Sequence, residues 1–235
     1  MRYAIYFAPD PASQLAELAA SWIGRDAATG RTVQQPDFDC MGADELAGIT
    51  GPARRYGFHG TLKAPFRLAE DKCESDLIEA MAAFCAGRPR FALEGLKIGS
   101  IDGFVALLPE GDVSELSEFA GDVVSAFDAC RAELTEAEIE RRNPEQLSLA
   151  ELRNLMRWGY PYVFDCFRFH MTLTSRVPDK DRDRVLRAAR EHFAPTTEQQ
   201  FMIDALTLFI EPEHGAPFEI HSRTPLASGL QRKIA

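Results

Sequence analysis

The chain has 235 residues, a formal net charge of −10 and a hydrophobic share of 46%. This length predicts one large domain or two small lobes that share an interface, and the apolar share excludes a disordered chain. An acidic surface repels polyanions at long range, so we expect no long nucleic acid as a partner. A small anionic substrate remains compatible with this charge if basic residues gather in one cleft.

The cysteines and the N-terminus indicate the compartment. The five cysteines are scattered, without CxxC or metal-knuckle spacing, which suits a reducing environment. The N-terminal apolar run is too short for a signal peptide, and no segment approaches the roughly 20 apolar residues of a membrane span. We therefore expect a cytoplasmic monomer with no membrane partner.

The first half of the chain alternates strands with helices. Aromatic and branched residues bounded by turn residues predict strands at residues 3–8, 58–66, 91–98 and 104–108. The last two strands turn at Asp102-Gly103, a dipeptide typical of hairpins. Apolar residues at helical spacing predict helices at residues 13–24 and 75–86, capped by Ser13 and Ser75. Residues 25–50 are predicted to be mostly loop, with a short helix starting at 44–46.

The second half repeats this order after a long helix at residues 114–135. Residues 136–154 are charged and helix-compatible, interrupted near Asn143-Pro144, and residues 158–162 indicate a loop. A strand, a helix and two more strands are then predicted at residues 163–175, 179–193, 201–211 and 218–222. The recurring order predicts an internal duplication and an α+β fold of two lobes. We expect a single domain over residues 1–235, with lobes at 1–135 and 155–235 and a linker helix region at 136–154.

One short motif lies within a predicted strand in each half. The two copies are His59-Gly60-Thr61-Leu62 and His170-Met171-Thr172-Leu173. Because side chains alternate between the faces of a strand, each copy presents its polar residues on one face. We expect His59, Thr61 and Lys63 on one strand to face Arg168, His170, Thr172 and Thr174 on the other across a cleft.

Cyclic phosphodiester chemistry needs what these faces offer. One imidazole can take a proton from the attacking water while the other protonates the leaving alkoxide, because both forms of histidine exist near neutral pH. The two threonine hydroxyls can bind the phosphate oxygens. Either histidine alone would more commonly be structural, but the agreement of spacing, face and following residue favours function for the pair. No third ligand accompanies any histidine pair, so we expect no metal and no cofactor.

Further side chains near the motifs are candidates for substrate binding. Arg55, Lys63 and Arg168 could supply the local positive charge that holds a phosphate, although ordinary ion pairs are an equal alternative. Tyr6 and Tyr160 could stack on a base or sugar, although structural aromatic residues are commoner.

The opening Arg2-Tyr3-Ala4-Ile5-Tyr6-Phe7-Ala8-Pro9 and both motif segments resemble the 2H phosphoesterase superfamily. More narrowly, they resemble its DUF1045-like branch, found with genes of bacterial phosphonate use. The resemblance spans essentially the whole chain. It implies a pseudo-twofold bilobal fold in which each lobe is an antiparallel sheet with helices on its outer face, and in which the motif strands line a central cleft.

The resemblance also implies His59 and His170 as the acid/base pair, with Thr61 and Thr172 as phosphate ligands. It implies a metal-independent hydrolase that opens a cyclic phosphodiester of a nucleotide or sugar phosphate, and a ribose cyclic phosphate is one candidate. Two alternatives stay open. One is an enzyme for RNA ends with 2′,3′-cyclic phosphates or 2′–5′ linkages, and the other is a non-catalytic module that binds a phosphorylated ligand.

Overall fold

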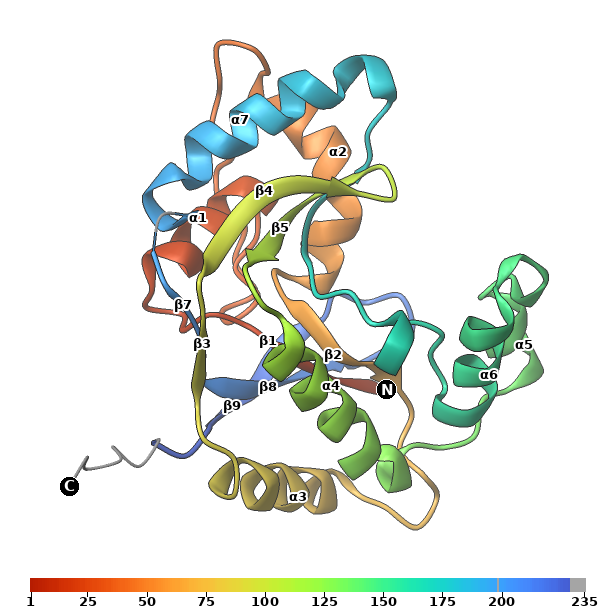
Figure 1. Ribbon diagram of the computed structural model, residues 1–235. Helices are drawn as coiled ribbons and strands as arrows, with labels where there is room; N and C mark the ends of the chain where they lie inside the picture. Colours follow the sequence, from red (N-terminus) through yellow and green to blue (C-terminus); the bar gives the residue numbers. More distant parts are fainter. Residues whose placement is uncertain (198, 229–235) are drawn as a thin grey trace.

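The computed structural model describes residues 1–197 and 199–228. Its centre is an antiparallel sheet of seven strands in the order β4-β5-β6-β2-β1-β8-β9 (Figure 1). These strands are β1 (Arg2–Phe7), β2 (Gly60–Phe66), β4 (Gly95–Ile101), β5 (Phe104–Glu110), β6 (Met171–Arg176), β8 (Ala205–Glu211) and β9 (Glu219–Pro225). A separate antiparallel pair consists of β3 (Phe91–Leu93) and β7 (Phe201–Ile203).

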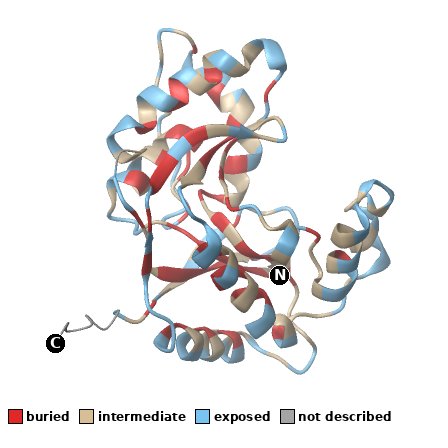
Figure 2. Ribbon diagram, in the orientation of Figure 1, coloured by how far each residue is buried: buried red, intermediate tan, exposed pale blue. Residues whose placement is uncertain are grey.

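The helices divide between the two halves of the sheet. They are α1 (Gln14–Ile23), α2 (Ala43–Tyr56), α3 (Glu74–Ala86), α4 (Ser114–Ala126), α5 (Glu136–Glu140), α6 (Leu149–Trp158) and α7 (Asp179–Thr197). Helices α1, α2 and α7 lie with β4–β6 at the top of Figure 1, and α3 and α4 lie with the other strands below. Figure 2 shows the strands largely buried and the outer helix faces exposed. The prediction of an α+β fold built on antiparallel strands is confirmed.

The predicted duplication is visible in the order of elements. The series β2-α3-β3-β4-β5 recurs as β6-α7-β7-β8-β9. Each repeat, however, sends its last two strands to the other half of the sheet: β5 pairs with β6, and β8 pairs with β1. The crossing segments β3 and β7 pair with each other. The expected lobes at residues 1–135 and 155–235 are therefore wrong at the level of strand pairing, because each half of the sheet takes strands from both repeats.

Several predicted boundaries also shift. Residues 43–56 form a continuous helix, longer than the short helix expected to start at 44–46, although Pro52 lies inside it. Burial of Leu46 and Ala53, together with a hydrogen bond from Arg54 to the carbonyl of Ile23, compensates for the weak helix propensity. Helix α3 is capped by Cys73 rather than Ser75, because the carboxylate of Asp76 accepts the backbone N–H of Cys73.

Two further predicted elements are shorter than expected. The second motif strand begins only at Met171, since a 3-10 turn at Phe164–Cys166 interrupts the expected strand. Helix α4 ends at Ala126 instead of residue 135. The hairpin turn at Asp102-Gly103 is confirmed, and it joins β4 to β5. None of the described helices combines the length and apolar character that crossing a membrane requires.

Candidate active site

The two motif strands are neighbours at the centre of the sheet. They are joined through one antiparallel pair, Gly60 opposite Met171. Extending this register by one residue sets His59 opposite Thr172, and Thr61 opposite His170. Opposed side chains on one face of such a pair lie about 5 Å apart. The strand pairing therefore gathers both histidines and both threonines around a local twofold centre.

Each histidine is held in the same way. The Nδ1 atom of His59 lies 2.8 Å from the carbonyl oxygen of Gly57, and Nδ1 of His170 lies 2.8 Å from that of Arg168. A carbonyl oxygen can only accept a hydrogen bond, so Nδ1 must carry the proton in both rings. Nε2 is then the atom that can accept a proton in the neutral ring, and that can donate one when the ring is protonated.

His59 has an aromatic environment. Its ring stacks on Tyr6, with ring centroids 3.8 Å apart and planes inclined by 18°. Burial, opposed by the Gly57 hydrogen bond and assisted by the charge of His170, lowers the pKa of His59 to about 4. His59 is therefore a neutral imidazole at neutral pH and can accept a proton.

The lowered pKa of His59 predicts a pH dependence of stability. The unfolded chain binds a proton near pH 6.5, whereas the folded chain does so only near pH 4, so stability is full above the higher value and falls as pH decreases toward the lower one. Between pH 8 and pH 5 we expect His59 to cost about 2 kcal/mol of unfolding free energy. Denaturant titrations of wild type and His59→Asn at both pH values measure this difference. Equal pH dependence in the two proteins would contradict the burial of His59.

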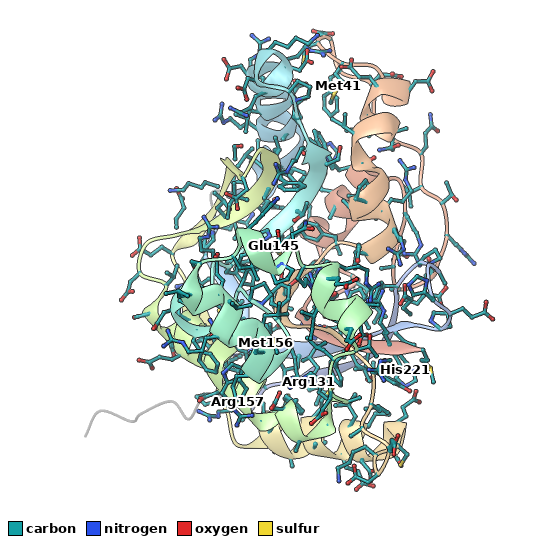
Figure 3. All side chains as sticks on the ribbon, turned by 90° about the vertical axis from the view of Figure 1, so that its right-hand side faces the viewer. Met41, Arg131, Glu145, Met156, Arg157 and His221 are labelled. Carbon is teal, nitrogen blue, oxygen red and sulfur yellow. The ribbon has the colours of Figure 1, made fainter. Side chains whose placement is uncertain are left out.

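Two cavities that share Tyr160 in their lining contain the motif residues. One, of about 210 Å³, is lined by Tyr6, His59, Thr61 and Thr172 among others. The other, of about 610 Å³, contains His170. Tyr160 lines both cavities, and also a narrow space that contains Thr61 and His170 together. The segment of α5 and α6 that leads to Tyr160 lies in front of the middle of the molecule in Figure 3, which labels Glu145, Met156 and Arg157 on it.

The other predicted binding residues occupy different places. Arg168 lines the cavity beside His170 and forms an ion pair with Asp102 at 3.1 Å. Tyr6 is buried and reaches the site through its stacking on His59 rather than as an open platform. Arg55 does not line either of these cavities, but lies in an adjoining one.

Lys63 does not share a face with His59 and Thr61, although strand alternation predicted that it would. Tyr6 pairs with Thr61 and Ile5 pairs with Lys63, so Leu62 is an extra residue that forms a β-bulge. The bulge turns Lys63 to the opposite face, where only 3% of the residue is exposed. There Nζ donates to the carbonyl of Val124 at 3.1 Å and lies 3.5 Å from Asp128. Lys63 thus links β2 to the last turn of α4 and to the residues that follow it, and it is not a candidate phosphate ligand.

Replacement of Lys63 tests whether this residue is structural or binds phosphate. We expect Lys63→Met to keep kcat/KM within about threefold of wild type, since the aliphatic stem still fills the same space and the ammonium group does not face the site. Burial lowers the pKa of Lys63 to about 8, so the folded protein favours the charged ammonium less than the unfolded chain does. Steady-state kinetics test this expectation. A 100-fold or greater loss of kcat/KM with an intact fold would show that Lys63 takes part in substrate binding or catalysis.

The structure adds residues that the sequence patterns did not single out. Arg2, Tyr56 and Arg142 line the cavity of His59. Strand alternation could have indicated Arg2, because it shares a face of β1 with Tyr6. Arg142 belongs to the segment between the repeats, and no periodicity predicts where it lies. Its guanidinium lies 4.9 Å from the ring centroid of Tyr160.

No group of three or more His, Cys, Asp or Glu side chains that could hold a metal occurs within residues 1–197 and 199–228. The groups that line the two cavities include the two imidazoles, the hydroxyls of Thr61 and Thr172, and several arginines.

Comparison with known proteins identifies the family. Residues 61–219 match the family described as "Protein of unknown function (DUF1045)". The chain belongs to this family. The predicted membership in the DUF1045-like branch is thereby confirmed.

Two curated relatives extend over most of the chain. Both are named "Ribose 1,5-bisphosphate phosphokinase PhnN". The protein of Janthinobacterium sp. (strain Marseille) is 39% identical over 98% of this chain, and that of Laribacter hongkongensis (strain HLHK9) is 39% identical over 94%. The match covers 52% and 50% of these relatives, so the chain spans about half of their length. A solved structure described as "Crystal structure of phosphoesterase" aligns with a TM-score of 0.44 and 14% identity, over 97% of this chain and 99% of that one.

Proposed function

We propose that the protein hydrolyses a cyclic phosphodiester of a small sugar phosphate, without a metal. The observation that carries the proposal is the pairing of Gly60 with Met171, which sets the two His/Thr pairs diagonally around one point. A phosphoryl group at that point has an imidazole on each side, as an in-line displacement at phosphorus requires.

The proposed reaction divides the proton transfers between the histidines. Neutral His59 takes a proton from water at Nε2 as the water oxygen attacks phosphorus. Protonated His170 gives its Nε2 proton to the ring oxygen whose bond to phosphorus breaks. The product is an acyclic phosphomonoester with a free sugar hydroxyl. Thr61, Thr172 and Arg168 stabilise the non-bridging oxygens as negative charge develops on them.

The relatives' names support a ribose phosphate as the substrate class. Opening a 1,2-cyclic phosphate of ribose between phosphorus and O2 yields a ribose 1-phosphate, a group present in ribose 1,5-bisphosphate. We therefore propose that the product carries the C1 phosphoryl group of ribose 1,5-bisphosphate, the compound in the relatives' names. The present sequence has no G-x-x-x-x-G-K-[ST] motif, so we assign the kinase step to the part of those relatives outside the matched residues.

A substrate series tests the proposal. Purified protein is incubated with ribose 1,2-cyclic phosphate, nucleoside 2′,3′-cyclic phosphates and an RNA oligonucleotide ending in a 2′,3′-cyclic phosphate, each with and without EDTA. We expect turnover of the ribose cyclic phosphate to be fastest and unaffected by EDTA. Preferred turnover of the RNA end would favour the alternative class of substrate. Binding without turnover of any member would contradict an enzymatic role.

A further inference from the structure

A basic cavity adjoins the site on the side of β1 and α2. It has a volume of about 300 Å³ and is lined by four arginines. One carboxylate, Glu138, shares the lining, and it is already bound by Arg67 at 3.1 Å. This concentration of positive charge contrasts with a chain whose net charge is −10. The arginines are Arg2, Arg55, Arg141 and Arg142.

Two of these arginines are fixed by a buried carboxylate. Glu211 is fully buried (0% exposed) and accepts hydrogen bonds from Arg2, from Arg55 and from the backbone N–H of Gly215. Burial raises its pKa, but the hydrogen bonds and charges of these partners outweigh burial and hold the pKa below the ordinary value. A single carboxylate between two guanidinium groups leaves one positive charge in excess. Glu211 therefore orients the pair without neutralising it.

Several N–H donors of the arginines that line the basic cavity have no acceptor among the described residues. Arg2 uses only Nε in its contact with Glu211, and its two terminal nitrogens make no hydrogen bond or ion pair within the described residues. Arg141 bonds only the carbonyl of Ala137, and Arg142 only stacks on Tyr160 in that same part of the chain. Planar guanidinium groups with free donors match the geometry of a phosphoryl group.

The basic cavity lies next to the cavity of His59. Arg2, Tyr56, Pro65 and Arg142 line both cavities. A ligand with its cyclic phosphate at the histidines can therefore extend past Arg2 and Arg142 into the second cavity. We propose that this cavity binds a second phosphoryl group, carried by the sugar apart from its cyclic phosphate. This inference rests on the proposed function and specifies its substrate as a phosphorylated sugar cyclic phosphate.

A paired comparison of substrates tests the second site. Ribose 1,2-cyclic phosphate is assayed with and without a phosphoryl group at C5, using wild type and the double variant Arg55→Gln/Arg141→Gln. These two arginines line the basic cavity but not the cavity of His59, and Arg2 still pairs with Glu211 in the variant. Arg153→Gln, an exposed site on α6, is the matched control for the loss of surface charge.

We expect wild type to prefer the C5-phosphorylated substrate. The double variant should lower kcat/KM for that substrate at least 30-fold more than for the unphosphorylated one, while Arg153→Gln changes the ratio less than threefold. Equal losses for both substrates, or no preference in wild type, would overturn the second site.

Direct binding separates this inference from the proposed function. If wild type turns over neither substrate, the proposed function fails, and calorimetric titration with ribose 5-phosphate still tests the cavity. Binding that weakens at least tenfold in Arg55→Gln/Arg141→Gln but persists in Arg153→Gln supports the second site. Equal affinity in all three proteins overturns it.

Discussion

His59→Asn and His170→Asn are each expected to lower kcat for a ribose cyclic phosphate by about 10³-fold, while the fold stays intact. General acid–base catalysis commonly contributes 10²- to 10⁴-fold, and the proposed mechanism assigns one proton transfer to each histidine. Asparagine retains an N–H that can donate to the carbonyl of Gly57 or Arg168, as Nδ1 does in the native rings. His221→Asn, at an exposed histidine on β9, serves as the control. Retained activity in either site variant would contradict the mechanism.

The choice of leaving group distinguishes the two histidines. The leaving group of a p-nitrophenyl phosphodiester is a stable phenolate, which needs no proton from the enzyme. We therefore expect His170→Asn to lose less than tenfold on this substrate, since only its acid function is missing. His59→Asn should still lose about 10³-fold, because water must be deprotonated with either leaving group. If His59→Asn loses less activity on this substrate than His170→Asn, then His59 is the acid and His170 the base. Equal losses would show that neither histidine acts solely as the acid.

The sequence predicts the placement of the two His/Thr pairs better than it predicts their surroundings. The repeated motif indicates two His/Thr pairs because strand alternation is a local property of the backbone. The alternation fails at Lys63, because the bulge at Leu62 depends on how β2 pairs with β1 and leaves no local signal. Similarly, Arg142 reaches the site only because the segment between the repeats folds back toward Tyr160.

The exchange of strands between the repeats is likewise a tertiary property. The hairpin of β4 and β5 is a local structure, and its turn is predicted by Asp102-Gly103. Its pairing with β6 is a long-range contact, reached through the three-residue segment β3, which pairs with β7. Helix α2 shows the same limit. Its glycines and Pro52 disfavour a helix, and burial of Leu46 and Ala53 overrides that preference. Local patterns therefore identified most elements, and long-range packing determined their arrangement.

Gly60→Ala is expected to lower the unfolding free energy by about 2 to 3 kcal/mol, the cost of inserting a methyl group into a close-packed core. Gly60 is the residue that pairs β2 with β6, and the ring of Phe169 fills the space beside it. A Cβ atom there would lie 2.4 Å from two ring atoms of Phe169, a distance that real Cβ contacts do not reach. Phe169 immediately precedes His170, so its displacement should also lower kcat by more than 100-fold.

A second substitution shows whether this contact is the cause. Phe169→Leu removes the ring atoms that a methyl group at residue 60 would meet. We expect Gly60→Ala/Phe169→Leu to be more stable than the sum of its single variants predicts, by about 1 to 2 kcal/mol, and to recover part of the lost activity. Gly48→Ala is the control, since a Cβ there meets nothing within 4 Å and alanine favours helix α2. If Gly60→Ala is as stable as Gly48→Ala, then Phe169 does not pack against Gly60. That result would contradict the pairing of β2 with β6 and the diagonal arrangement of the two His/Thr pairs.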